Sequence, residues 1–84
     1  RPFLHYEIDP PGEKILGDPP FDPQLCEEFW RAFVMAAGIT LHLVLIRGRN
    51  THHIIEASFK GAARALYDAV VVADEVLPST KGVL

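Results

Sequence analysis

The stretch DPQLCEEFWRAFVMAAGITLHLVLIRGRN, residues 22–50, decides the fold, because it holds a helix, a stop signal and a strand in succession. Its opening Asp-Pro pair is typical of a helix start: the aspartate accepts hydrogen bonds from free backbone N–H groups, and the proline needs no partner there. Gly38 supplies a left-handed stop. The β-branched and leucine-rich run that follows contains no breaker. The pattern therefore predicts a helix over 22–37 and a largely buried strand over 39–47.

One apolar stripe of the helix over 22–37 is expected to face the core. Its members recur every three or four residues and are Leu25, Phe29, Ala32, Phe33 and Ala36. Cys26 lies beside this stripe and is interpreted as a core filler, because the sequence places no base next to it that would make it a nucleophile. Trp30 and Arg31 are expected to face outward and to pack against another chain.

The first 20 residues are predicted to form a strand hairpin. Residues 3–8 alternate between apolar and other side chains with the period of two of a half-buried strand. The proline-rich run after them leaves room only for a short second strand around 13–16. His5 and His42 stand on predicted strands, where a surface or hydrogen-bonded histidine is the default interpretation.

A second helix is predicted over 51–72, with Asn50 or Thr51 as its cap, because Ala, Glu, Lys, Arg and Leu dominate this stretch. Its expected core face consists of Ile55, Phe59, Ala62, Leu66 and Ala69. The tail over 73–84 contains a proline and a glycine and is expected to be irregular.

These elements predict an α+β fold with the order β-β-α-β-α. Residues 1–84 form a single domain, with both helices on one face of a small antiparallel or mixed sheet. The other sheet face lacks a cover, so association with further polypeptide is expected.

The composition indicates one globular domain of 84 residues: 49% of the residues are hydrophobic, 23% are charged, and the net charge is −3. No broad basic field points to nucleic acid. The apolar runs are shorter than the roughly 20 residues that span a bilayer. The single cysteine cannot form an internal disulfide, which fits a reducing cytoplasm. The chain opens on Arg1 rather than methionine, so we expect a fragment of a longer protein.

The motif HHIIEASFK, residues 52–60, carries the chemistry. On a helix, Glu56 lies about 40°, Lys60 about 80° and His53 about 100° around the axis from His52, so the four polar groups share one arc. A histidine and a carboxylate four residues apart can chelate one cation, while the adjacent histidine can point to another. Imidazole with carboxylate suits Mn, Fe, Zn or Co. The alternative is a solvated histidine pair beside a simple Glu–Lys ion pair.

Two further candidate binding residues or segments can each be explained without a function. Glu28 lies at the edge of the first helix's apolar stripe and is either a metal ligand or a surface residue. The terminal PSTKGVL offers the hydroxyl and ammonium groups of Ser79, Thr80 and Lys81, which suit an oxyanion such as phosphate, unless this is an ordinary frayed tail.

Five segments, RPFL, LCEEFWRAF, AGITLHL, THHIIEASFKGAARAL and PSTKGVL, together resemble the C-terminal half of the imidazoleglycerol-phosphate dehydratases, which are enzymes of histidine biosynthesis. The resemblance spans nearly the whole chain. It implies that the chain is one half of a duplicated fold whose β-β-α-β-α units resemble the second domain of ribosomal protein S5, each with an HHxxE helix.

The resemblance also implies the site. Two Mn²⁺ ions per active site would take ligands from His52, His53 and Glu56, and Glu28 stands where many relatives have a ligating histidine. The substrate phosphate would be held by Lys60, Ser79, Lys81 and Arg1.

The implied reaction is that of a hydro-lyase: dehydration of D-erythro-imidazole glycerol phosphate to imidazole acetol phosphate, with the ring bound as an imidazolate between two divalent ions. Sites of this family form between subunits of a 24-subunit shell and need HHxxE helices from both halves. Only one is present here, and no general base can be nominated in these residues. The alternative function is therefore a non-catalytic assembly and metal-binding module.

Overall fold

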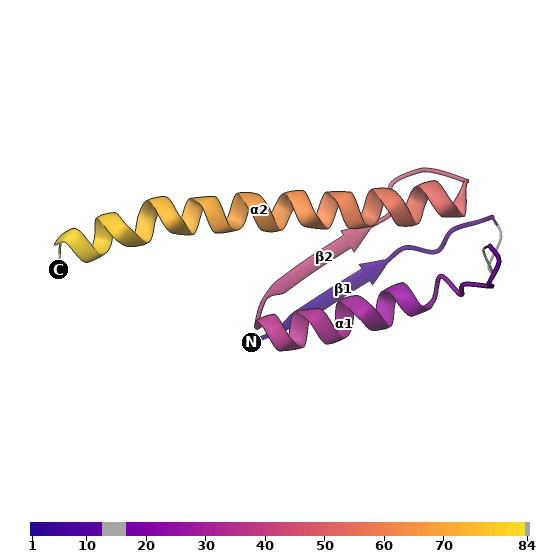
Figure 1. Ribbon diagram of the computed structural model, residues 1–84, viewed down its shortest axis with the longest axis horizontal. Helices are drawn as coiled ribbons and strands as arrows, with labels where there is room; N and C mark the ends of the chain where they lie inside the picture. The colour runs from indigo at the N-terminus through magenta and orange to yellow at the C-terminus, as the bar shows by residue number, and fades with distance from the viewer. Residues whose placement is uncertain (13–16, 84) are drawn as a thin grey trace.

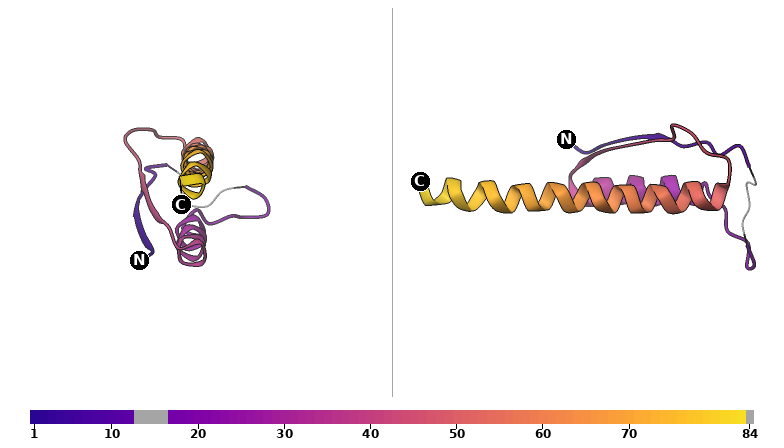
Figure 2. Two further views of the ribbon diagram at one scale, coloured as in Figure 1. Left: turned by 90° about the vertical axis from the view of Figure 1, so that its left-hand side faces the viewer. Right: turned by 90° about the horizontal axis from the view of Figure 1, so that it is seen from above.

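The structure, a computed structural model, describes residues 1–12 and 17–83, with the side chains of its last helix described as far as residue 71. The elements in order are β1 (Phe3–Glu7), α1 (Leu25–Ala37), β2 (Thr40–Val44) and α2 (Thr51–Val83) (Figure 1). Both helices lie on one face of the sheet, which confirms the predicted α+β arrangement (Figure 2). The second strand expected around 13–16 lies outside the described residues.

The two strands pair in parallel, in a register that runs from Phe3 opposite Thr40 to Glu7 opposite Val44. The antiparallel alternative is therefore wrong for these strands, whereas the mixed alternative depends on the strand expected around 13–16, which lies outside the described residues. The reason is topological: α1 stands between them in sequence and carries the chain back along the sheet, so β2 starts at the same end as β1.

The core lies between the sheet and the two helices. Its buried members are Leu4, Trp30, Val34, Leu41, Leu43 and Ala62, and Phe59 of α2 packs against them. The ring of Trp30 lies 5.5 Å from that of Phe33 and 5.0 Å from that of Phe59, centre to centre. Trp30 thus joins α1 to α2, and the expectation that it faces outward is wrong.

The buried face of α1 is turned from the predicted stripe by about one residue. Its buried side chains are Cys26, Trp30 and Val34, whereas Leu25 and Phe29 are 56% and 51% exposed. Most of the circumference of this helix is apolar, so spacing alone fits more than one face. The bulky indole fills the space between sheet and α2 and thereby sets the rotation. The interpretation of Cys26 as a core filler is confirmed.

The strand β2 is shorter and more exposed than expected. Leu41 and Leu43 point into the core, while Thr40, His42 and Val44 face away from the helices. On this outer face the ring of His42 lies 5.6 Å from that of His5, centre to centre. The expected burial of 39–47 fails because the helices cover only one face of the sheet; the surface interpretation of the two histidines is confirmed.

The first helix begins and ends with local hydrogen bonds. Asp22 Oδ1 accepts the N–H of Gln24 at 2.9 Å within a turn that precedes the helix, so α1 begins at Leu25, three residues later than expected. At the other end Gly38 adopts φ 67°, ψ 36° and donates its N–H to the carbonyl of Val34 at 2.9 Å. The predicted left-handed stop is confirmed.

Replacing Gly38 by alanine is expected to lower the free energy of unfolding by about 1–2 kcal/mol, because a Cβ disfavours the left-handed region. No atom lies within 4 Å of that added Cβ, so the loss reflects backbone conformation alone. Gly61→Ala is the matched control. Its added Cβ also has no atom within 4 Å, but Gly61 lies inside α2, so this substitution should raise the free energy of unfolding by about 1 kcal/mol. Urea unfolding checks both, and a neutral Gly38→Ala would contradict the assigned role.

The second helix is longer than predicted. It continues past the expected end at residue 72 to Val83, so the expected irregular tail is wrong up to that residue. No glycine or proline interrupts residues 62–77, and the i to i−4 hydrogen bonding continues through them. Figure 1 shows that α2 runs well beyond the sheet and α1. Further along α2, Tyr67 and Val70 are 65% and 62% exposed. Within the described residues, no helix is long and apolar enough to cross a membrane.

Candidate metal centre

The start of α2 fixes the positions of its two histidines. Asn50 Oδ1 accepts the N–H of His53 at 2.9 Å, and the Asn50 carbonyl accepts the N–H of Ile54 at 2.9 Å. This confirms Asn50 as the cap among the two predicted candidates. His52 and His53 therefore stand in the first turn of a capped helix, where the backbone is held in place.

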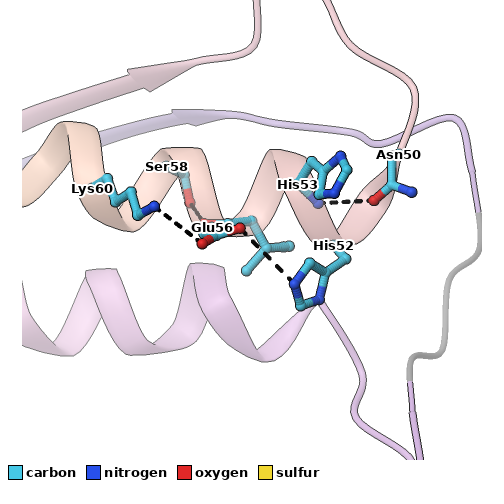
Figure 3. A network of polar contacts seen from close by, with 7 residues as sticks. Asn50, His52, His53, Glu56, Ser58 and Lys60 are labelled. Atoms are coloured by element: carbon cyan, nitrogen blue, oxygen red, sulfur yellow. Dashed lines mark hydrogen bonds and ion pairs between the residues drawn. The ribbon is translucent and has the colours of Figure 1, made fainter.

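Three polar side chains form a row along one side of α2 (Figure 3). His52 Nε2 lies 3.9 Å from Glu56 Oε1, and the second carboxylate oxygen, Oε2, lies 3.1 Å from Lys60 Nζ. Each residue is four positions from the next, so each stands above its neighbour on the helix surface. All three side chains are exposed, so the row is accessible to a ligand or to another polypeptide.

The row determines the protonation of Glu56. The hydrogen bond from Lys60 and the charge of its ammonium group lower the pKa of Glu56, and the neighbouring histidines contribute in the same direction. Desolvation opposes this shift, but it is the weaker influence. The carboxylate is therefore held in its ionised form, which is the form that binds a metal ion.

His53 faces another part of the molecule. Its ring lies 5.8 Å from that of His52, centre to centre, in an edge-on arrangement, and Figure 3 shows it beside Asn50, away from the Glu56 row. It lines a cavity of about 690 Å³ between β2, the β2–α2 loop and α2. The two adjacent histidines thus point toward two separate regions of the molecule, as their angles around the helix axis predict.

The donor types fit a transition-metal ion in part. His52 and Glu56 can share one cation, and His53 offers a nitrogen to a second. Among the side chains that the structure describes, those of residues 1–12 and 17–71, no group of three or more His, Cys, Asp or Glu is placed to hold a metal. A complete coordination shell needs donors beyond these described side chains.

The remaining predicted residues are not gathered at this row. Glu28 is exposed on α1, and no hydrogen bond or ion pair in the described part of the chain joins it to His52. Arg1 is exposed near the N-terminus, which lies at the end of the sheet away from the start of α2 (Figure 1). The ligand role of Glu28 and the anion role of Arg1 stay predictions.

The predicted phosphate residues of α2 are widely spaced on the chain. The side chains of Ser79 and Lys81 lie outside the described part. The helix backbone is continuous from Lys60 to Lys81, and 21 rises of 1.5 Å separate their backbones by roughly 30 Å. In this conformation one chain does not bring these two lysines to one phosphate.

Sequence reasoning missed the lining of the cavity beside His53. No functional role was predicted for Arg47 or Arg49, yet both line this cavity together with Asn50 and Ser58. Two arginines directly before a histidine pair were the available signal. Their guanidinium groups place positive charge in the lining of the cavity, next to His53.

Comparison with known proteins gives consistent matches. The sequence model of the family described as imidazoleglycerol-phosphate dehydratase matches residues 1–66. Curated proteins of that name are similar over the whole chain: one from Symbiobacterium thermophilum is 55% identical, one from Aliarcobacter butzleri 52%, and one from Lactococcus lactis 50%. The chain spans 40%, 43% and 43% of their respective lengths. No solved structure matches it significantly.

Proposed function

Because the chain belongs to the imidazoleglycerol-phosphate dehydratase family, we propose that the protein carrying it dehydrates D-erythro-imidazole glycerol phosphate to imidazole acetol phosphate in histidine biosynthesis. The observation that carries this proposal is the row of His52, Glu56 and Lys60 on a capped helix. It combines metal donors and an anion-binding ammonium group within two helical turns. A family likeness over the entire chain supports the same reading.

We propose that His52 and Glu56 hold one Mn²⁺ ion and that His53 holds a second. Glu28, which is exposed on α1, is the candidate for a further ligand supplied across an interface, since no hydrogen bond or ion pair among the described residues joins it to His52. The chemistry such ions supply is electrostatic: they stabilise the negative charge that develops on an imidazole ring when a weakly acidic C–H proton is removed.

The other proposed site residues of this chain bind and orient the substrate. Lys60, Ser79, Lys81 and Arg1 are proposed to anchor the phosphate group, which places the reacting carbons at a fixed position and contributes orientation rather than bond breaking. Because Lys60 and Lys81 stand far apart on α2, their contacts with one phosphate require residues from different protomers. No residue of this chain is assigned as general base; that group would come from the remainder of the protein.

The small number of metal donors gathered among the described side chains supports assembly with further polypeptide. We propose that the missing ligands come from an N-terminal half with its own HHxxE helix and from neighbouring subunits, in a 24-subunit cytoplasmic shell. The likeness to the second domain of ribosomal protein S5 stays a prediction. The exposed apolar side chains of Leu25, Phe29 and Met35 on α1 support burial against further polypeptide.

Metal removal tests the proposed function. Dialysis of the intact protein against a chelator should abolish turnover of imidazole glycerol phosphate, and added Mn²⁺ should restore it, because the charge on the ring then has no other stabiliser. Elemental analysis before and after dialysis gives the metal content. Full turnover in fully demetallated protein would contradict the proposal, whereas bound metal without turnover would favour the non-catalytic module.

A further inference from the structure

The carboxylate of Glu56 is shared by two neighbours. One oxygen lies 3.1 Å from Lys60 Nζ, within ion-pair distance, and the other lies 3.9 Å from His52 Nε2 (Figure 3). A cation placed between the imidazole and Glu56 would draw on the same negative charge that now holds Lys60. Metal and lysine are therefore competitors for one group.

Lys60 can leave Glu56 without disturbing the fold. Its side chain is 76% exposed, and the structure gives it no other ion pair in the described part of the chain. A divalent ion at Glu56 would also repel the ammonium group at short range, since both are positive. The ammonium, once released, has a flexible four-carbon stem and three unused donors, which suit a phosphate oxygen.

We propose that Lys60 couples the two binding events of the site: a cation bound by His52 and Glu56 releases Lys60, and the released lysine then binds the anion. This inference rests on the proposed function, because it uses the same classes of ligand. In the absence of cation, Lys60 neutralises Glu56 and the anion meets a paired lysine. The anion therefore binds more weakly when the cation is absent. By linkage, each ligand strengthens the other's binding by the same factor.

The test measures binding in the intact protein, with Mn²⁺ and inorganic phosphate as the probes. Free Mn²⁺ is followed by its electron paramagnetic resonance signal, with and without phosphate, against a protein-free blank. In the wild type, phosphate should tighten Mn²⁺ binding by at least about 5-fold, the lower end of typical coupling. Lys60→Met should bind Mn²⁺ about 3- to 10-fold more tightly without phosphate, because a competitor and a nearby positive charge are gone. In this variant, phosphate should produce little of the tightening of Mn²⁺ binding that it produces in the wild type.

Arg64→Met is the matched control. Arg64 forms an exposed ion pair of the same i, i+4 type with Asp68, at 3.5 Å on the same helix, and touches neither proposed ligand. It should behave like the wild type in both titrations. Lys60→Met with unchanged Mn²⁺ affinity and unchanged phosphate coupling would overturn the inference and leave the proposed metal site intact. A wild-type protein that binds no Mn²⁺ would overturn both.

Discussion

Replacing His52 by alanine should reduce turnover of the intact protein by more than about 100-fold and lower its Mn²⁺ content. The basis is geometric: His52 Nε2 and Glu56 Oε1 lie 3.9 Å apart on one face of α2, close enough to share one ion. Loss of a group that merely orients a ligand costs 10- to 100-fold, so loss of the ligand itself should cost more.

His42→Ala provides the control for removing an imidazole elsewhere. His42 is exposed on the outer face of the sheet, where its ring contacts those of Phe3 and His5. This variant should retain the metal and most of the turnover. Steady-state kinetics and elemental analysis on the same samples decide the matter: a His52→Ala protein with wild-type metal content and rate would remove His52 from the site.

Replacing Trp30 by alanine should produce the largest loss of stability, about 3–5 kcal/mol, as expected for truncating a large buried aromatic side chain. Trp30 is 4% exposed and its ring contacts Phe29, Phe33 and Phe59, so it links both helices. The free energy of unfolding of a small domain is only about 5–15 kcal/mol, so this substitution would remove a large part of it. The free energy of unfolding by urea is the measurement.

Phe29→Ala is the sharpest comparison, because the two aromatics are adjacent and the sequence pattern assigned them the opposite roles. Phe29 is 51% exposed, so its truncation should cost less than half as much as that of Trp30. Equal losses at both positions, or a larger loss at Phe29, would show that α1 is rotated toward the face that its periodicity predicted.

Much of the fold could be predicted because its signals are local. The left-handed stop at Gly38, the Asn50 cap and the alternation in β1 each depend on a few neighbouring residues. The rotation of α1 could not be predicted, because apolar residues surround most of that helix and only the partner surface selects a face. The parallel pairing of the strands likewise depends on the path of the chain in space.

One part of the candidate site could be predicted from the sequence, and another part could not. The His52, Glu56 and Lys60 row was predictable, since helical spacing alone places residues four apart in contact. The position of Glu28 relative to the histidines depends on how α1 and further polypeptide meet α2, and no spacing within this chain encodes that. The cavity beside His53 was missed because its arginines come from a loop whose course depends on β2.

The open face of the sheet has a practical consequence for handling this segment by itself. Parallel sheets are normally covered on both sides, and strands with free edges readily recruit other strands. Among the described residues, the parallel pair of β1 and β2 presents Phe3 and Val44, 53% and 49% exposed, on its outer face. Produced as an isolated piece, the segment carries an aggregation liability that rises with protein concentration, and a solubilising fusion partner should reduce it.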